Sequence, residues 1–161
     1  MKTAAIICEY NPFHNGHKYH IEQTRLQHGA THIVCVMSGN FTQRGDVALA
    51  DKYARARAAL MGGADLVVEL PTPLSSAEHF AMGACRIADS LGCVDMLSFG
   101  SECGDVSVLE EAAGAVEYAV QTDEFFSLMR KGTSYPAALK QTVEKNYTSD
   151  VVQTLTEPNN T

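Results

Sequence analysis

Hydrophobic and polar residues follow two different spacings along the chain, and these spacings separate expected strands from expected helices. Four short apolar runs, rich in β-branched residues, are typical of buried parallel strands; they cover residues 3–8, 31–37, 65–70 and 94–99. Segments with helical spacing lie between them, at about residues 16–27, 52–61 and 77–91. Because strands alternate with helices, the pattern predicts an α/β fold with a parallel sheet and right-handed crossovers.

The pattern changes beyond residue 105, where helical spacing predominates. It predicts helices over about residues 106–121, 123–131 and 135–146, and no internal repeat or linker interrupts them. We therefore expect one domain, with an α/β core over residues 1–104 and a helical extension of the same domain over residues 105–161.

Composition is that of an ordinary globular protein. The 161 residues are 45% hydrophobic, and no uncharged apolar run approaches the length that spans a membrane. Met1–Thr3 leads directly into the first expected strand, without the pattern of a signal peptide. The five cysteines form no Cys-x-x-Cys pair, which favours reduced core thiols over disulfides or zinc. We expect a cytoplasmic protein with no membrane partner.

Charge is distributed unevenly. Residues 1–60 hold seven Lys and Arg against four Asp and Glu, a net charge of +3, whereas residues 61–161 hold five against fifteen, a net charge of −10. Five of the six histidines lie in the first of these segments. This distribution favours an anionic ligand near the N-terminal histidines, and it gives no sign of a broad basic surface for nucleic acid.

The histidines concentrate where the first strand joins the first helix. His14 and His17 lie three residues apart, with Gly16 between them, at the expected start of the helix. Free backbone N–H groups and the positive end of the helix dipole favour a phosphate at such a join. Gly16 has no Cβ, so a base or phosphate could lie against the backbone. The alternative is two ordinary surface histidines near a helix start, and the context makes it the weaker interpretation.

A zinc site is the poorer interpretation of the same histidines. His20 completes a His-x-x-His-x-x-His spacing, but along a helix the first and third side chains lie roughly 120° apart. No cysteine or carboxylate has ligand spacing beside them, so we predict no metal site in the protein. Lys18 either adds charge to the phosphate site or points to solvent.

The segment from Ser38 to Leu49 is long for an α/β connection, which makes it a functional candidate. It contains Arg44, whose alternative role is a solvated turn arginine. Arg55 and Arg57 follow on the next helix, and at that spacing they cannot face the same way. At most one of them enters a site, and both could be structural.

Four sequence blocks together resemble one family. They are Asn-Pro-Phe-His-Asn-Gly-His at residues 11–17, Ser-Gly-Asn-Phe-Thr-Gln-Arg-Gly at 38–45, Ala-Asp-Leu-Val-Val-Glu-Leu-Pro at 64–71 and Phe-Gly-Ser-Glu at 99–102. His-Asn-Gly-His is similar to the His-x-Gly-His signature of the nucleotidylyltransferase superfamily. The four blocks, in this order, resemble the bacterial tRNA(Met) cytidine acetate ligase family.

The resemblance implies a Rossmann-like, doubly wound parallel sheet of the nucleotidylyltransferase type. It implies strand order 3-2-1-4, which would bring the histidines beside residues 99–102. It also implies that ATP, with Mg²⁺ carried on its phosphates, activates acetate as acetyl-adenylate. The acetyl group would then pass to the wobble cytidine of elongator tRNA(Met). It leaves formation of a homo-oligomer open.

The resemblance further implies site residues. His14 and His17 would be catalytic, and Arg44 would belong to a loop that meets substrate or RNA. The nucleotide-binding residues would be Cys8, Glu9, Tyr10, Asn11, Phe13, Asn15, Gly16, Lys18, His20, Gly100, Ser101 and Asn160. Glu69, at the end of the third expected strand, is more simply explained as structural.

Two other functions remain open from the sequence. One is an adenylyl- or cytidylyltransferase that acts on a small phosphorylated cofactor precursor, because it would share the histidine motif. The other is a nucleotide- or RNA-binding module without catalysis. The family extends well beyond 161 residues, so we expect the 105–161 extension to be truncated. We also expect this chain to fold and bind nucleotide weakly, but not to acetylate tRNA.

Overall fold

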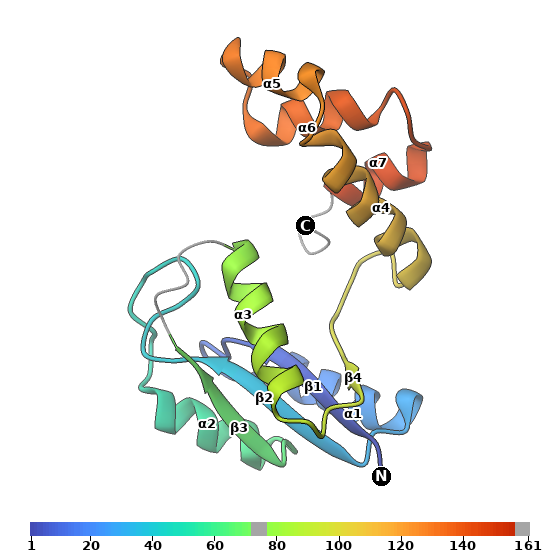
Figure 1. Cartoon of the computed structure of the whole chain (residues 1–161). Coiled ribbons are helices and arrows are strands. Elements are labelled where there is room, and N and C mark those ends of the chain that lie inside the picture. Colours follow the sequence, from blue (N-terminus) through green and yellow to red (C-terminus); the bar gives the residue numbers. More distant parts are fainter. Residues whose placement is uncertain (72–76, 157–161) are drawn as a thin grey trace. The chain divides into compact units, whose positions relative to one another are not determined.

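The computed structural model describes residues 1–71 and 77–156, and the chain divides into two compact units (Figure 1). The first unit spans Met1–Phe99 and contains every strand of the described residues. The second spans Gly100–Thr161, and the regular elements among its described residues are all helices. Each unit has its own cluster of buried apolar side chains.

The first unit alternates strands and helices in chain order. Its elements are β1 (Thr3–Cys8), α1 (Asn15–His28), β2 (His32–Ser38), α2 (Lys52–Met61), β3 (Leu66–Leu70), α3 (Ala77–Ser90) and β4 (Met96–Leu97). The four strands form one parallel sheet in the order β3-β2-β1-β4. The doubly wound α/β fold and the strand order 3-2-1-4 are thereby confirmed.

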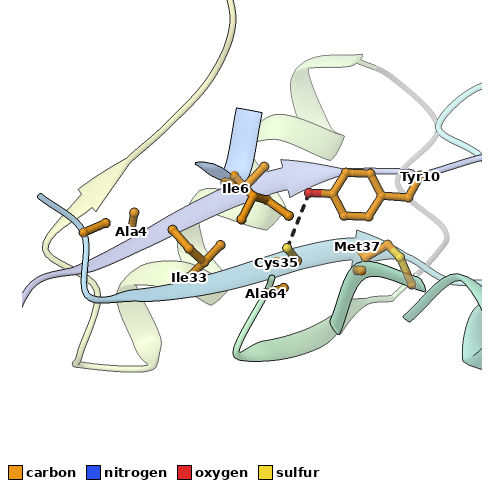
Figure 2. Close-up of a cluster of buried hydrophobic side chains, with 10 residues drawn as sticks. Ala4, Ile6, Tyr10, Ile33, Cys35, Met37 and Ala64 are labelled. Carbon is orange, nitrogen blue, oxygen red and sulfur yellow. Dashed lines mark hydrogen bonds between the residues drawn. The ribbon is translucent and has the colours of Figure 1, made fainter. Parts of the chain in front are cut away.

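Helices cover both faces of this sheet because alternate strand residues point to opposite sides. On one face Ile6, Ile33 and Cys35 of the strands lie in one buried cluster (Figure 2), which also contains Ile21 of α1 and Ala59 of α2. On the other face α3 packs across the sheet (Figure 1), and the buried residues are Ala5, Val36, Leu70, Ala84 and Ala88. The carboxyl ends of β1 and β2 therefore emerge between two covered faces, beside the starts of α1 and the segment before α2.

The fourth strand is shorter than predicted, with two residues in place of the expected 94–99. Its regular pairing stops at Asp95 because the Asp95 carboxylate, rather than a backbone carbonyl, accepts the Thr3 N–H at 2.7 Å. At the other end Ser98 still donates its N–H to the Ala5 carbonyl at 2.9 Å. One polar side chain thus ends the ladder, which apolar periodicity does not reveal.

The second unit contains α4 (Val106–Ala119), α5 (Asp123–Arg130), α6 (Tyr135–Val143) and α7 (Ser149–Thr156). The first three match predicted helices, although α6 ends three residues early. The helix α7 was not predicted: Val and Thr make up half of its eight residues, and both have modest helix propensity. Burial of Val151 and Thr154 stabilises it instead. Within the described residues, no helix combines the length and apolar character needed to cross a membrane.

Candidate functional site

The turn that follows β1 begins with an unusual backbone conformation. Tyr10 has a φ of 47°, in the left-handed region that side chains other than glycine seldom adopt. Its ring is buried, and its hydroxyl lies 3.5 Å from Cys35 Sγ of β2 (Figure 2). Because the ring is held in the core, the chain after Tyr10 turns back toward the start of α1.

His14 and His17 form the N-terminal cap of α1. His14 has extended backbone dihedrals, and its Nδ1 accepts the Gly16 N–H at 3.1 Å. In return, His17 Nδ1 accepts the His14 N–H at 3.3 Å. A ring nitrogen that accepts a hydrogen bond carries no proton, so each neutral imidazole has its proton on Nε2. The cap therefore sets both rings in the tautomer whose Nε2–H can donate to a ligand.

Aromatic contacts fix the His17 ring. It stacks on His14 with a centroid distance of 3.6 Å, and its centroid lies 4.7 Å from Tyr10 and 5.6 Å from Phe13. Burial lowers the pKa of His17 to about 4, and the nearby His14 and His20 add to the effect. His17 is therefore neutral near pH 7, in agreement with the tautomer that its hydrogen bond requires.

These residues line a cavity of about 360 Å³ at the carboxyl end of β1. Seven of the predicted site residues contribute to its wall, namely Cys8, Glu9, Tyr10, Asn11, His14, His17 and His20. Ile6, Ile7 and Pro12 complete the wall and were not predicted. The volume is within the range of small-ligand pockets. Three imidazoles and a carboxylate thus share one concave surface.

Other predicted residues of this turn lie beside the cavity. Phe13 packs into the core next to Gly62, and Asn15 is exposed at the start of α1. Lys18 is exposed, with its Nζ 3.8 Å from Glu22 Oε1. These positions do not line the cavity described above.

The expectation of free N–H groups at the helix start needs correction. His14 itself accepts the Gly16 N–H, and the His14 carbonyl accepts the His17 N–H at 3.0 Å. A Cβ on Gly16 would lie 3.0 Å from His14 Cε1. The missing Cβ therefore makes room for the His14 ring. The donors offered to a ligand are consequently imidazole Nε2–H groups more than backbone amides.

His20 connects the cavity to the end of β4. Its Nε2 lies 2.9 Å from Ser98 Oγ, which in turn lies 2.6 Å from Thr24 Oγ1. Burial lowers the pKa of His20. Ser98 was missed by the sequence analysis, which chose the residues immediately after it. Its only sequence signal is its place at the end of an apolar strand.

Gly100, Ser101 and Asn160 are the remaining predicted nucleotide contacts. Gly100 and Ser101 belong to the second unit, where Ser101 Oγ accepts the Gly104 N–H at 3.3 Å. Asn160 lies outside the described residues. The roles of all three stay predictions.

The cavity offers neither an activated thiol nor a set of metal ligands. Burial raises the pKa of the Cys8 thiol far above its usual value, so the group is protonated and a poor nucleophile. Within the described residues, no group of three or more His, Cys, Asp or Glu side chains lies close enough to hold a metal ion. The arrangement is suited to binding and polarising an anion.

Arg44 lies at the tip of a short hairpin formed by residues 40–48. Phe41 pairs with Val47 in an antiparallel bridge, and Arg44 is exposed in the turn between them. Two wall residues of the cavity reach this segment: Glu9 Oε1 accepts the Gln43 N–H, and Asn11 Oδ1 accepts the N–H of the residue after the hairpin, Leu49, at 2.7 Å. The hairpin is thus bonded directly to the turn that carries the histidines.

Glu69 and Arg55 both contact other parts of the protein, as expected for residues with a structural role. Glu69 Oε2 lies 2.7 Å from Lys52 Nζ, at the start of α2. Arg55 is buried, whereas Arg57 on the same helix is exposed. The contacts of Arg55 lie behind the cavity wall and are described below.

Comparison with known proteins agrees with this geometry. The family model described as HIGH Nucleotidyl Transferase matches residues 1–161. The tRNA(Met) cytidine acetate ligase of Acetivibrio thermocellus is 46% identical over 170 residues, and that of a Geobacillus species is 44% identical over 164 residues. Each alignment covers 99% of this chain and 40% of the relative.

A solved structure has the same fold. The crystal structure of Thermotoga maritima TmcAL bound with alpha-thio ATP superposes with a TM-score of 0.85 at 38% sequence identity, over 99% of this chain and 41% of that one. The chain therefore spans about two-fifths of the length of these relatives. The His14–His17 motif, the parallel sheet and the full-length family match lead to one conclusion: the chain belongs to the HIGH nucleotidyl transferase family.

Proposed function

We propose that this chain binds ATP in the cavity at the β1–α1 turn and activates acetate there, as the nucleotide-binding part of a tRNA(Met) cytidine acetate ligase. The observation that carries the proposal is the pair of capping imidazoles, His14 and His17, on the wall of that cavity. The names of the relatives and the ATP analogue bound by the Thermotoga maritima protein support the choice of reaction.

The proposed reaction has two balanced steps. A carboxylate oxygen of acetate attacks the α-phosphorus of ATP, and the bond from that phosphorus to the oxygen that bridges to the β-phosphate breaks. Acetyl-adenylate forms and pyrophosphate leaves with the bonding electrons. The amine of the wobble cytidine then attacks the acetyl carbon, AMP leaves, and the amine loses a proton. Neither step requires a covalent bond to the protein.

The two histidines act on the phosphates. Negative charge grows on the phosphate oxygens during attack, and donors already in position stabilise that charge without reorganising. The cap leaves Nε2–H of His14 and of His17 as such donors. His17 would act as a neutral donor, because protonation would turn Nδ1 into a donor and break its bond to the His14 N–H. Mg²⁺ would arrive bound to the ATP phosphates, and its charge would help to neutralise them.

The proposal also includes contacts from residues outside the cavity wall. Gly100 and Ser101 would approach the nucleotide after β4, and Asn160 would add a further contact. Arg44 would meet the acetyl acceptor or the reactants, because its hairpin is bonded to the cavity wall through Glu9 and Asn11.

The tRNA surface is not assigned to this chain. Its net charge is −7, and affinity for RNA depends heavily on neutralising phosphates with Lys and Arg. Transfer to elongator tRNA(Met) would therefore need contacts from the rest of a protein as long as the relatives. Action in the cytoplasm and assembly into a homo-oligomer are part of the same proposal.

Calorimetry with MgATP, and with MgCTP as the matched control, tests the nucleotide. We expect ATP to bind more tightly. Equal or tighter binding of CTP would favour a cytidylyltransferase acting on a small phosphorylated precursor. Absence of binding by either nucleotide would contradict the proposal.

Acetate-dependent exchange of pyrophosphate into ATP tests the chemistry. His17→Ala should lower the exchange rate by about a hundredfold, the scale for losing one donor to a developing oxyanion. His28→Ala is the control, because His28 is exposed at the far end of α1. An exchange rate unchanged by His17→Ala would refute the assigned role.

A further inference from the structure

Arg55 is a buried cation next to the proposed nucleotide site. Only 2% of its surface is exposed, although it lies on α2 two residues before the exposed Arg57. A buried charge is costly unless hydrogen bonds compensate it. An arginine in such a position therefore has a specific set of acceptors.

Those acceptors come from three separate segments. Nε donates to the Ala50 carbonyl at 3.0 Å, before α2. Nη1 donates to the Glu9 carbonyl at 2.5 Å, after β1, and to Ser38 Oγ at 3.4 Å. Nη2 donates to the Ser38 carbonyl at 3.2 Å and to the Gly39 carbonyl, at the end of β2. None of the five acceptors is a carboxylate, and all lie at the carboxyl ends of two adjacent strands or just before α2.

The hydrogen bond from Arg55 to the Glu9 carbonyl affects the turn that leads to the histidines. The Glu9 carbonyl belongs to the peptide that precedes Tyr10, the residue with positive φ. Such a conformation persists only where the surroundings determine it. Arg55 fixes the peptide before Tyr10, and Cys35 contacts the hydroxyl at the other end of that side chain. Tyr10, which begins the turn leading to His14, is therefore held both at its backbone and at its hydroxyl group.

The hydrogen bonds from Arg55 to Ser38 and Gly39 hold the start of the hairpin. These residues immediately precede the 40–48 hairpin, and the hairpin is bonded to Glu9 and Asn11. One guanidinium thus joins the turn that carries the histidines to the start of the hairpin that carries Arg44. Its donors are already used within the protein, and it is buried, so Arg55 does not reach a ligand.

We propose that Arg55 is a positioning residue for the nucleotide site: it holds the Glu9–Tyr10 peptide and the Ser38–Gly39 strand end so that His14 and His17 keep the geometry for phosphates. This proposal rests on the proposed function, which assigns the phosphates to those histidines. Lysine could not replace Arg55, because an ammonium group lacks the planar fork that reaches five acceptors.

The test compares Arg55→Lys with Arg57→Lys, which makes the same change on the exposed side of α2. Imidazole signals in ¹⁵N NMR are recorded without nucleotide, and MgATP affinity is measured by calorimetry. For Arg55→Lys we expect shifted signals for His14 and His17, with His28 and His32 unmoved as internal controls. We also expect ATP affinity to fall about tenfold or more, as for a displaced binding group. Arg57→Lys should change neither measurement.

The outcomes separate this proposal from the proposed function. Absence of ATP binding by the unaltered chain would contradict the function, while the imidazole signals would still test Arg55. If Arg55→Lys folds with unmoved His14 and His17 signals and unchanged ATP affinity, the proposal is overturned.

A second variant covers a failure to fold. If Arg55→Lys loses its cooperative unfolding transition, Ser38→Ala removes only the Oγ acceptor of Nη1. It should shift the same two imidazole signals by a smaller amount. Unmoved signals in Ser38→Ala would then overturn the proposal.

Discussion

Gly62 should be as important to the His17 geometry as residues of the motif itself. It follows α2, and a Cβ built on it would lie 2.3 Å from Phe13 Cζ and 2.6 Å from Phe13 Cε1. The Phe13 ring is packed in turn against Tyr10, at 4.9 Å between centroids, and against His17. Gly62→Ala would therefore push Phe13 toward the aromatic group that fixes His17.

The expected loss of stability combines packing in the folded protein with the conformational freedom of the unfolded chain. Gly62 has a φ of −80°, which alanine adopts without strain. Overpacking a core contact costs about 1–3 kcal/mol. A change from glycine to alanine also reduces the conformational freedom of the unfolded chain, which stabilises the folded protein by about 0.4–1 kcal/mol. The net destabilisation should thus be about 1–2 kcal/mol.

Urea unfolding measures this cost, and Gly114→Ala is the matched control. Gly114 lies within α4, and a Cβ there would meet no atom within 4 Å, so helix propensity should stabilise the protein by about 1 kcal/mol. ATP affinity should fall in Gly62→Ala and stay constant in Gly114→Ala. A Gly62→Ala protein with the stability and ATP affinity of the unaltered chain would refute the claim that Phe13 sets the position of His17.

Two further predictions concern stability. Because the pKa of His17 is about 4 in the folded protein against 6.5 for an ordinary histidine, the unfolded chain takes up more protons between these values. Stability should therefore fall as the pH drops from 6.5 to 4, by about 1–2 kcal/mol after allowance for the partly exposed ring, and urea unfolding of His17→Ala should lack this contribution. Asp51→Ala should cost about 1 kcal/mol in the same assay, because the Asp51 carboxylate accepts two backbone N–H groups in the first turn of α2.

Apolar periodicity was sufficient to predict much of the first unit. The apolar run from residue 3 to 8 is a strand because it is buried between helices on both faces, and α2 covers the predicted residues 52–61. Periodicity failed where a single polar contact or tertiary packing decides the outcome. Asp95 ends the β4 ladder with its side chain, and packing rather than propensity stabilises α7.

The composition of the site was predictable, but its internal bonding was not. The sequence places His14 and His17 at a helix start, and it shows that Arg55 and Arg57 face different ways. It does not show which arginine is buried, because burial depends on carbonyl groups of Glu9 and Ser38, far from Arg55 in the sequence, as well as that of Ala50. Nor does it reveal the positive φ of Tyr10, since tyrosine gives no signal for that conformation.

The histidine cap explains why this helix start can face an anion. The usual capping box has Ser or Thr at the cap and Glu or Gln three residues later. A glutamate at that position would bring a negative charge beside the proposed phosphate site. Here His14 and His17 make the same reciprocal bonds through Nδ1 and retain Nε2–H as a donor. One pair of side chains thus begins the helix and offers hydrogen bonds to a ligand.

This explanation predicts that helix capping and nucleotide binding can be separated. The double variant His14→Ser/His17→Glu replaces one capping box with the other, so urea unfolding should show a stability within about 1 kcal/mol of the unaltered chain. Calorimetry should show a loss of MgATP affinity of about a hundredfold, because two donors are removed and a carboxylate is added. His14→Ser/His17→Gln is the control for charge: it should keep the cap and lose less affinity, since its amide adds no charge. Retention of ATP affinity by the Glu variant would mean that the imidazoles serve the helix alone, and the nucleotide would have to bind through other groups.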